Sequence, residues 1–168
     1  MKIAVVLLLF TAAAFAQVVP TASTAACGHD TVSFKVKVDE SQHTLMDPEP
    51  GKARVYFVQD AGTTIGLAYP TVKMGMDGQW VGANRLNSYF SVSVEPGEHH
   101  VCVMLQSSLL AQRVELAHFT AEAGKTYFYR TRIVMSRSVE LLELEPIDSD
   151  QGKYLVALFP LSVSSPKK

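Results

Sequence analysis

Histidine and cysteine side chains near the middle of the chain are the residues best suited to bind a metal. His100 and Cys102 are two positions apart, so on an extended strand they share one face, and His99 lies on the other. An imidazole and a thiolate can both bind zinc, but a zinc site needs further protein ligands and a free thiol. We therefore expect no metal. The simpler interpretation is that His99 or His100 hydrogen-bonds the backbone beside the Pro96-Gly97 turn.

A pair of arginines could bind an anion. Arg130 and Arg132 are also two positions apart on a predicted strand and share one face. The planar guanidinium group suits carboxylate and phosphate oxygens, so these two residues are candidate ligand-binding side chains. The alternative is that they form cross-strand salt bridges with acidic residues of the next predicted strand, namely Glu140, Glu143 and Glu145.

Aromatic residues could form a docking surface for a sugar or a protein. The candidates are Trp80, Tyr89, Tyr127 and Tyr129. An exposed aromatic strip on a sheet face would serve such a role, whereas core packing is the alternative. We expect Phe90 and Phe128 in the core, and the pattern does not decide the positions of the tyrosines.

No catalytic motif is complete. Gly124-Lys125-Thr126 resembles the end of a phosphate-binding loop, but Phe119 stands where that motif has glycine, and strand-forming residues follow. The segment 148–152 resembles the start of a calcium loop, but its glycine comes one position early, so we expect a hairpin loop there. The sequence favours a non-enzymatic protein without a cofactor. The alternative is a small exported metal-dependent or hydrolytic enzyme that uses His100, His118 or the arginine pair.

The charge balance argues against a nucleic-acid partner. Lysine and arginine number 15 and aspartate and glutamate 16, which gives a net charge of -1. Binding to nucleic acid or to anionic lipid would need a basic surplus or stripe. The expected partner is an unknown protein or glycan.

The first 16 residues have the pattern of a signal peptide. Lys2 is the basic residue, Ile3–Phe10 is the apolar run, and Ala14-Phe15-Ala16 is a small-x-small cleavage site. A transmembrane anchor would need about 20 apolar residues, and this run is shorter. We therefore predict a secreted or periplasmic protein with no membrane span after cleavage.

The two cysteines are expected to form a disulfide between Cys27 and Cys102. Exported proteins enter an oxidising compartment, in which cysteines usually pair. The bond would hold the N-terminal segment against a central strand. One alternative is that both thiols stay unpaired. Another is that Cys27 carries a lipid, since the small residues Ala25-Ala26 precede it. The protein would then be a lipid-anchored envelope protein.

The remaining chain is dominated by the two-residue period of β-strands. Ser88–Val94 alternates apolar and polar residues, and Asp77-Gly78, Pro96-Gly97 and Gly124 supply turns. A helix over 109–123 is the alternative to a strand at Val114–Thr120. The other candidate strands are Val32–Val38, Ala53–Gln59, Thr71–Met76, Gln79–Ala83, His99–Leu105, Thr126–Met135, Val139–Leu144 and Tyr154–Phe159. We expect about seven to nine of these ten segments to form strands, which indicates an all-β sandwich or barrel.

These signals divide the 168 residues into four parts, with a single domain of ordinary size. Residues 1–16 are the signal peptide, 17–30 an extended leader, 31–160 the β-sandwich domain and 161–168 a polar tail.

Three segments together resemble a bacterial family of secreted proteins and lipoproteins classed as a domain of unknown function. They are Met76–Gly82, Ser88–His99 with its Pro-Gly-x-His hairpin, and Ala123–Arg130 with its Ala-Gly-Lys-x-Tyr pattern. The Pro-Gly hairpin is also similar to that of PEGA-type, transthyretin-like surface modules. The resemblance, which covers about 51–159, implies a single antiparallel sandwich of the transthyretin-like or immunoglobulin-like kind in the cell envelope or outside the cell. It implies no catalytic residue.

Overall fold

The computed structural model describes residues 26–29, 32–60, 70–85, 87–106, 114–136 and 139–167, so the predicted signal peptide and most of the leader lie outside the described residues. Strands and one helix make up the described chain. The strands are β1 (Phe34–Asp39), β2 (Ala53–Gln59), β3 (Thr71–Met76), β4 (Gln79–Arg85), β5 (Ser88–Val94), β6 (Gly97–Leu105), β7 (Val114–Ala121), β8 (Thr126–Ser136), β9 (Val139–Ile147) and β10 (Leu161–Pro166); the helix is α2 (Ser149–Leu158).

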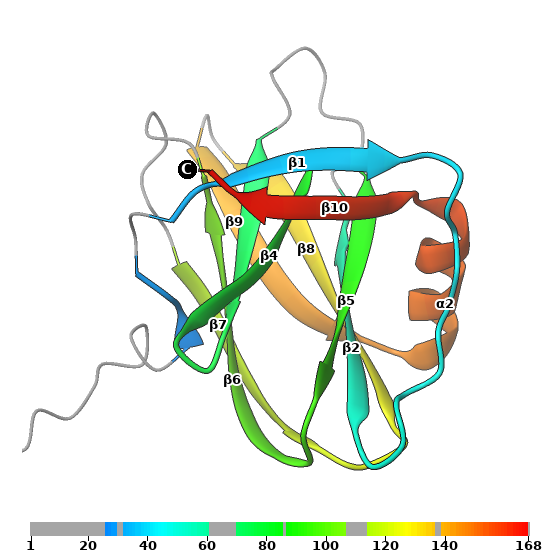
Figure 1. Ribbon diagram of the computed structural model, residues 1–168. Helices are drawn as coiled ribbons and strands as arrows, with labels where there is room; N and C mark the ends of the chain where they lie inside the picture. Colours follow the sequence, from blue (N-terminus) through cyan, green and yellow to red (C-terminus); the bar gives the residue numbers. More distant parts are fainter. Residues whose placement is uncertain are drawn as a thin grey trace, which may run out of the picture.

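Two sheets form the layers of a sandwich (Figure 1). The six-stranded sheet has the order β1-β10-β5-β2-β8-β9, and the four-stranded sheet has the order β4-β3-β6-β7. The mostly-β, two-sheet architecture confirms the sequence-based prediction of the fold class. The expectation of seven to nine strands was too low, because the described residues form ten. The sheets are also not purely antiparallel, because β2 runs parallel to β8 and β10 runs parallel to β5.

The central strand β2 is buried on both of its faces. Val55 and Phe57 point into the main core between the two sheets, where residues of β3, β5 and β6 meet them. Tyr56 and Val58 point the other way, into a second core that α2 covers with Leu155 and other apolar residues. The six-stranded sheet is therefore covered on its outer side as well, and β2 positions both cores.

The predicted strand at Tyr154–Phe159 was wrong, because these residues belong to α2 and to its C-cap. The predicted hairpin loop at 148–152 was wrong for the same reason. Asp148 is the N-cap of the helix, and its side chain accepts hydrogen bonds from the backbone N–H groups of Asp150 and Gln151, both at 2.9 Å.

The polar tail expected at 161–168 contains a strand of the six-stranded sheet. β10 pairs with β1 over its whole length, from Phe34 opposite Pro166 to Asp39 opposite Leu161. Its serines also join the two sheets, because Ser162 Oγ donates to the backbone carbonyl of Ala83 at 3.0 Å. The helix considered at 109–123 is not formed in its described part, which is β7.

Candidate functional site

Two neighbouring strands, β4 and β5, separate after the turn that joins them (Figure 1). Ser88 closes this turn by donating from its hydroxyl to the carbonyl of Arg85 at 2.9 Å. β4 then continues in the four-stranded sheet and β5 in the six-stranded sheet. Near the turn, β10 bridges the gap: Ser164 Oγ accepts a hydrogen bond from the Ala83 amide at 3.1 Å. Farther from the turn, β10 no longer pairs with β5.

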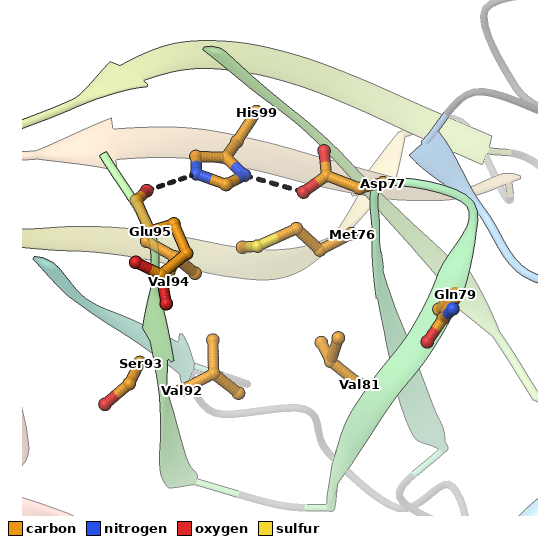
Figure 2. Close-up of a pocket in the computed structure, with 9 residues that line it drawn as sticks. All are labelled: Met76, Asp77, Gln79, Val81, Val92, Ser93, Val94, Glu95 and His99. Carbon is orange, nitrogen blue, oxygen red and sulfur yellow. Dashed lines mark hydrogen bonds and ion pairs between the residues drawn. The ribbon is translucent and has the colours of Figure 1, made fainter. Parts of the chain in front are cut away.

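A pocket of about 300 Å³ lies in the space between the separating strands. Its lining is apolar at the centre, where the side chains of Val81 and Val92 face one another from β4 and β5 below Met76 (Figure 2). Val81 and Val92 also pack against the main core. Polar side chains surround this centre, namely Asp77, Gln79, Ser93, Glu95 and His99. The pocket is thus an opening into the hydrophobic core with a polar rim.

One edge of β5 carries no ladder beyond Tyr89 among the described residues. The Tyr89 amide donates to the carbonyl of Pro160 at 3.1 Å, on the side away from β2. Backbone groups of successive strand residues point to alternate edges, so those of Ser91 and Ser93 point to the same side as those of Tyr89. β10 pairs with β5 only at Tyr89. The N–H and C=O groups of Ser91 and Ser93 therefore line an open strand edge beside the pocket.

His99 closes one end of the pocket by joining two turns (Figure 2). Its Nδ1 lies 2.6 Å from Asp77 Oδ2 and its Nε2 lies 2.8 Å from the Glu95 carbonyl oxygen. A carboxylate and a carbonyl oxygen can only accept, so both bonds form together when the ring is protonated and both nitrogens donate. The bond to Glu95 confirms that a histidine hydrogen-bonds the backbone beside the Pro96-Gly97 turn.

The surroundings of His99 favour its protonated form. Burial by itself would lower the pKa of His99, but the hydrogen bonds to the Glu95 carbonyl and the Asp77 carboxylate, together with the charge of Asp77, raise it above its ordinary value. The cation links the β3–β4 turn to the end of β5. This end of the pocket is therefore held by a charged hydrogen-bond bridge.

Asp77 shapes the turn as well as holding His99. Asp77 and Gly78 both have positive φ, at 51° and 78°, which is the type I′ hairpin that the Asp-Gly pair predicts. The second carboxylate oxygen, Oδ1, accepts the backbone N–H of His100 at 2.9 Å. The short side chain of aspartate tolerates the left-handed conformation and reaches both donors.

Glu95 of the rim and Glu49, which is hydrogen-bonded to Ser93 of the rim, have cationic or hydroxyl partners. Lys52 Nζ lies 3.3 Å from Glu95 Oε1 and 3.6 Å from Glu49 Oε2. The hydrogen bond from the Ser93 hydroxyl lowers the pKa of Glu49, and the hydrogen bond to Glu95 raises the pKa of Lys52. Because the charges at the rim are paired, the pocket offers an apolar cavity and backbone groups rather than a net charge.

The two predicted arginines lie on another part of the fold and bind an acidic residue. Arg130 Nη2 is 2.6 Å and Arg132 Nη2 is 2.8 Å from Oε1 of Glu145 on β9, and Arg130 also lies 3.8 Å from Asp60. Burial by itself would raise the pKa of Glu145, but the hydrogen bonds from both arginines lower it overall. This is the cross-strand pairing that the sequence offered as the alternative to anion binding.

The predicted aromatic residues do not share one exposed strip. Tyr129 is in the main core, and the Tyr127 hydroxyl donates to the Thr120 carbonyl at 3.1 Å. Tyr89 is buried under α2. Trp80 is partly buried on the outer side of the four-stranded sheet, where its Nε1 donates to the carbonyl of His29 at 2.6 Å. These side chains mainly hold the structure together.

The predicted disulfide between Cys27 and Cys102 is confirmed, with the two Cα atoms 5.6 Å apart. It fixes the N-terminal segment to β6, and a lipidated Cys27 could not form it, because the lipid would occupy its sulfur. Gly75 permits the close approach, since a Cβ there would lie 2.8 Å from Cys102 Sγ.

The histidines and the arginine pair of the enzymatic alternative do not share one site. His100 and His118 are exposed on the four-stranded sheet, whereas the arginine pair is on the six-stranded sheet. Within the described ranges there is no group of three or more His, Cys, Asp or Glu residues suited to hold a metal ion. No helix in the described part of the chain has the length and apolar character needed to cross a membrane.

The sequence of the pocket residues gave no signal of the pocket. Its lining comes from four strands and two turns, and only the fold places them side by side.

In comparisons with known proteins, a family described as a protein of unknown function, DUF2846, matches residues 49–143. No curated protein and no solved structure matches the chain.

Proposed function

The chain belongs to the DUF2846 family of unknown function, and we propose that it is an exported, non-enzymatic module that binds an extended peptide segment of a partner protein. In this proposal the segment adds to the open edge of β5 and places an apolar side chain in the pocket between β4 and β5. The open edge next to an apolar pocket is the observation that carries the proposal.

Strand addition accounts for both halves of the site. An extended peptide can hydrogen-bond an exposed strand edge through its backbone, while pockets receive alternate side chains and provide selectivity. Ser91 and Ser93 supply the backbone groups, and the space between Val81 and Val92 receives a side chain. An unprotected strand edge otherwise promotes aggregation, so its presence beside a pocket favours a binding role.

The chemistry of the rim supports binding rather than catalysis. His99 lines the pocket, but both of its ring nitrogens are engaged, one with the Asp77 carboxylate and one with the Glu95 carbonyl. An imidazolium with two acceptors has no lone pair with which to take a proton from a substrate. The position of His99 suits a structural role, in which it keeps the pocket open.

Two observations support export. The N-terminal 16 residues have the pattern of a signal peptide. The disulfide between Cys27 and Cys102 is typical of proteins that fold in an oxidising compartment. The resemblance to bacterial secreted proteins and to transthyretin-like surface modules agrees with a place in the cell envelope or outside the cell.

The test is selection of peptides by the purified mature protein from a phage library of random linear peptides. The affinity of the selected peptides is then measured for the wild type and for two variants at one position. Ser91→Pro removes an N–H group from the open edge without touching the ladder to β2, whereas Ser91→Ala removes only the hydroxyl. We expect Ser91→Pro to lower the affinity at least about tenfold, which is the worth of one good hydrogen bond, and Ser91→Ala to bind like the wild type.

A third variant, Val92→Lys, tests the pocket by filling it with a charged side chain. We expect it to abolish binding of peptides while circular dichroism stays that of the wild type. Peptides that bind both Ser91→Pro and Val92→Lys with unchanged affinity would refute the proposal. So would a protein that selects no peptide but binds defined oligosaccharides on a glycan array.

A further inference from the structure

Two histidines lie side by side on the outer face of the four-stranded sheet, away from the pocket. His100 on β6 is directly opposite His118 on β7 in the antiparallel register. Both side chains are exposed. Residues that are directly opposite on neighbouring strands point to the same face, so the two imidazole rings project to solvent together.

The backbone geometry brings these two side chains as close as a sheet allows. The His100 carbonyl accepts from the Asp77 amide at 3.0 Å, and the His100 amide donates to Asp77 Oδ1 at 2.9 Å. Both backbone groups of His100 thus point toward the β3 side and away from β7. His100 and His118 are therefore a non-hydrogen-bonded pair, in which Cα atoms are about 4.5 Å apart and side chains are closer than in the other kind of pair.

The rings are available for a ligand. Neither imidazole has a hydrogen-bond or ionic partner among the described residues. The neighbouring outward residue of β6, Cys102, is bound in the disulfide and does not compete. A metal–imidazole nitrogen distance is about 2.0–2.1 Å, so two rings on adjacent strands can reach one ion between them.

We propose that His100 and His118 form a binding site for one divalent transition-metal ion, with water in the remaining coordination positions. Imidazole nitrogens suit Cu²⁺, Ni²⁺ and Zn²⁺, and the intrinsic order of affinities places Cu²⁺ first. A site with two protein ligands and open positions is suited to capture or transfer of an ion rather than to permanent structural binding, which uses four protein ligands. This site is separate from the pocket, so the inference goes beyond the proposed peptide binding.

The experiment is a titration of the mature, disulfide-bonded protein with Cu²⁺ alone. Calorimetry measures the affinity and the number of ions bound, and electron paramagnetic resonance identifies the ligands. We expect one ion per chain and a spectrum with coupling to two nitrogen atoms. His100→Gln and His118→Gln should each lower the affinity at least about tenfold, because even groups that only orient a metal ligand contribute that much. The matched control is His29→Gln, which changes another exposed histidine and should bind like the wild type.

Two results would overturn the proposal. The first is undiminished binding of Cu²⁺ by the double variant His100→Gln/His118→Gln. The second is that His29→Gln lowers the affinity for Cu²⁺ as much as His100→Gln and His118→Gln do, which would place the site elsewhere. Both substituted positions are on the surface, and circular dichroism of each variant distinguishes loss of a ligand from loss of the fold.

Discussion

His99 and Asp77 are separated by 22 positions in the sequence, yet His99 Nδ1 lies 2.6 Å from Asp77 Oδ2. The bond ties the β3–β4 hairpin to β6 and, through Glu95, to the end of β5. The fold thus uses one imidazolium to hold three segments of both sheets at the rim of the pocket.

We predict that Asp77→Asn lowers the free energy of unfolding by about 1 kcal/mol. The change keeps a residue that tolerates positive φ, but it removes the charge that faces His99. Hydrogen bonds to charged groups contribute about 1.5–3 kcal/mol, and the partial exposure of Asp77 reduces this value. Urea unfolding of Asp77→Asn, His99→Gln and the double variant gives the coupling energy, and purely additive effects of the two changes would contradict the assigned bridge.

The arginines around Glu145 predict a specific loss of stability in acid. The pKa of Glu145 is lowered in the folded protein, so this carboxylate contributes stability that is fully present above the ordinary pKa of an unfolded glutamate. That contribution is lost as the pH falls through the lowered folded value. The measurement is urea unfolding of the wild type and Glu145→Gln from about pH 6 to about pH 2.5. The stability difference should shrink toward acid pH, and a constant difference would rule out this linkage.

Reduction of the disulfide should destabilise the protein strongly. The bond joins residues 75 positions apart. Closing a loop of that length restricts the unfolded chain by roughly 4 kcal/mol, as an upper figure. Urea unfolding of Cys27→Ser/Cys102→Ser should show a lower midpoint than the oxidised wild type. Reductant should lower the midpoint of the wild type and leave that of the variant unchanged. Equal midpoints for the variant and the oxidised protein would mean that the bond does not hold the folded state.

Gly152→Ala separates helix propensity from packing. In an exposed helix alanine is favoured over glycine by about 1 kcal/mol. Here a Cβ at Gly152 would overlap the Phe128 ring, and overpacking costs about 1–3 kcal/mol. We therefore expect a net loss of stability in thermal unfolding, whereas Lys153→Ala, at the exposed neighbouring position, should change little. A more stable Gly152→Ala would show that α2 does not seat on Phe128 at this position.

The full-length chain expressed in a bacterial host with a periplasm should be cleaved after Ala16. Intact mass of the exported protein then corresponds to a chain that starts at Gln17 and lacks two hydrogen atoms because of the disulfide. An uncleaved chain in the cytoplasm would contradict export, and an added lipid mass on Cys27 would contradict the disulfide.

The strands were predictable where alternation and turn chemistry agree. The sequence gives the bounds of β2, β3 and β5 as the structure has them, because apolar periodicity runs between clear turn residues such as Asp77-Gly78. The disulfide was predicted from the signal-peptide pattern and the number of cysteines.

α2 and β10 were missed for physical reasons. Leu155, Val156 and Phe159 form a short apolar run that fits a strand as well as a helix face, and only the Asp148 N-cap signals the helix. In β10, Ser162 and Ser164 contact the backbone of β4, so polar residues there serve in sheet contacts rather than in a tail. The pocket depends on how two sheets diverge, which no local pattern encodes.

Because β1 pairs with β10, the first strand of the domain can join its sheet only after the last strand has been made. In the described chain β10 is the only sheet neighbour of β1, and the parallel pair β2–β8 also joins distant segments. Pairings of this kind form slowly, because a long loop must close before any contact rewards it. The six-stranded sheet therefore stays incomplete until β10 has been synthesised, whereas the four-stranded sheet needs only residues 71–121.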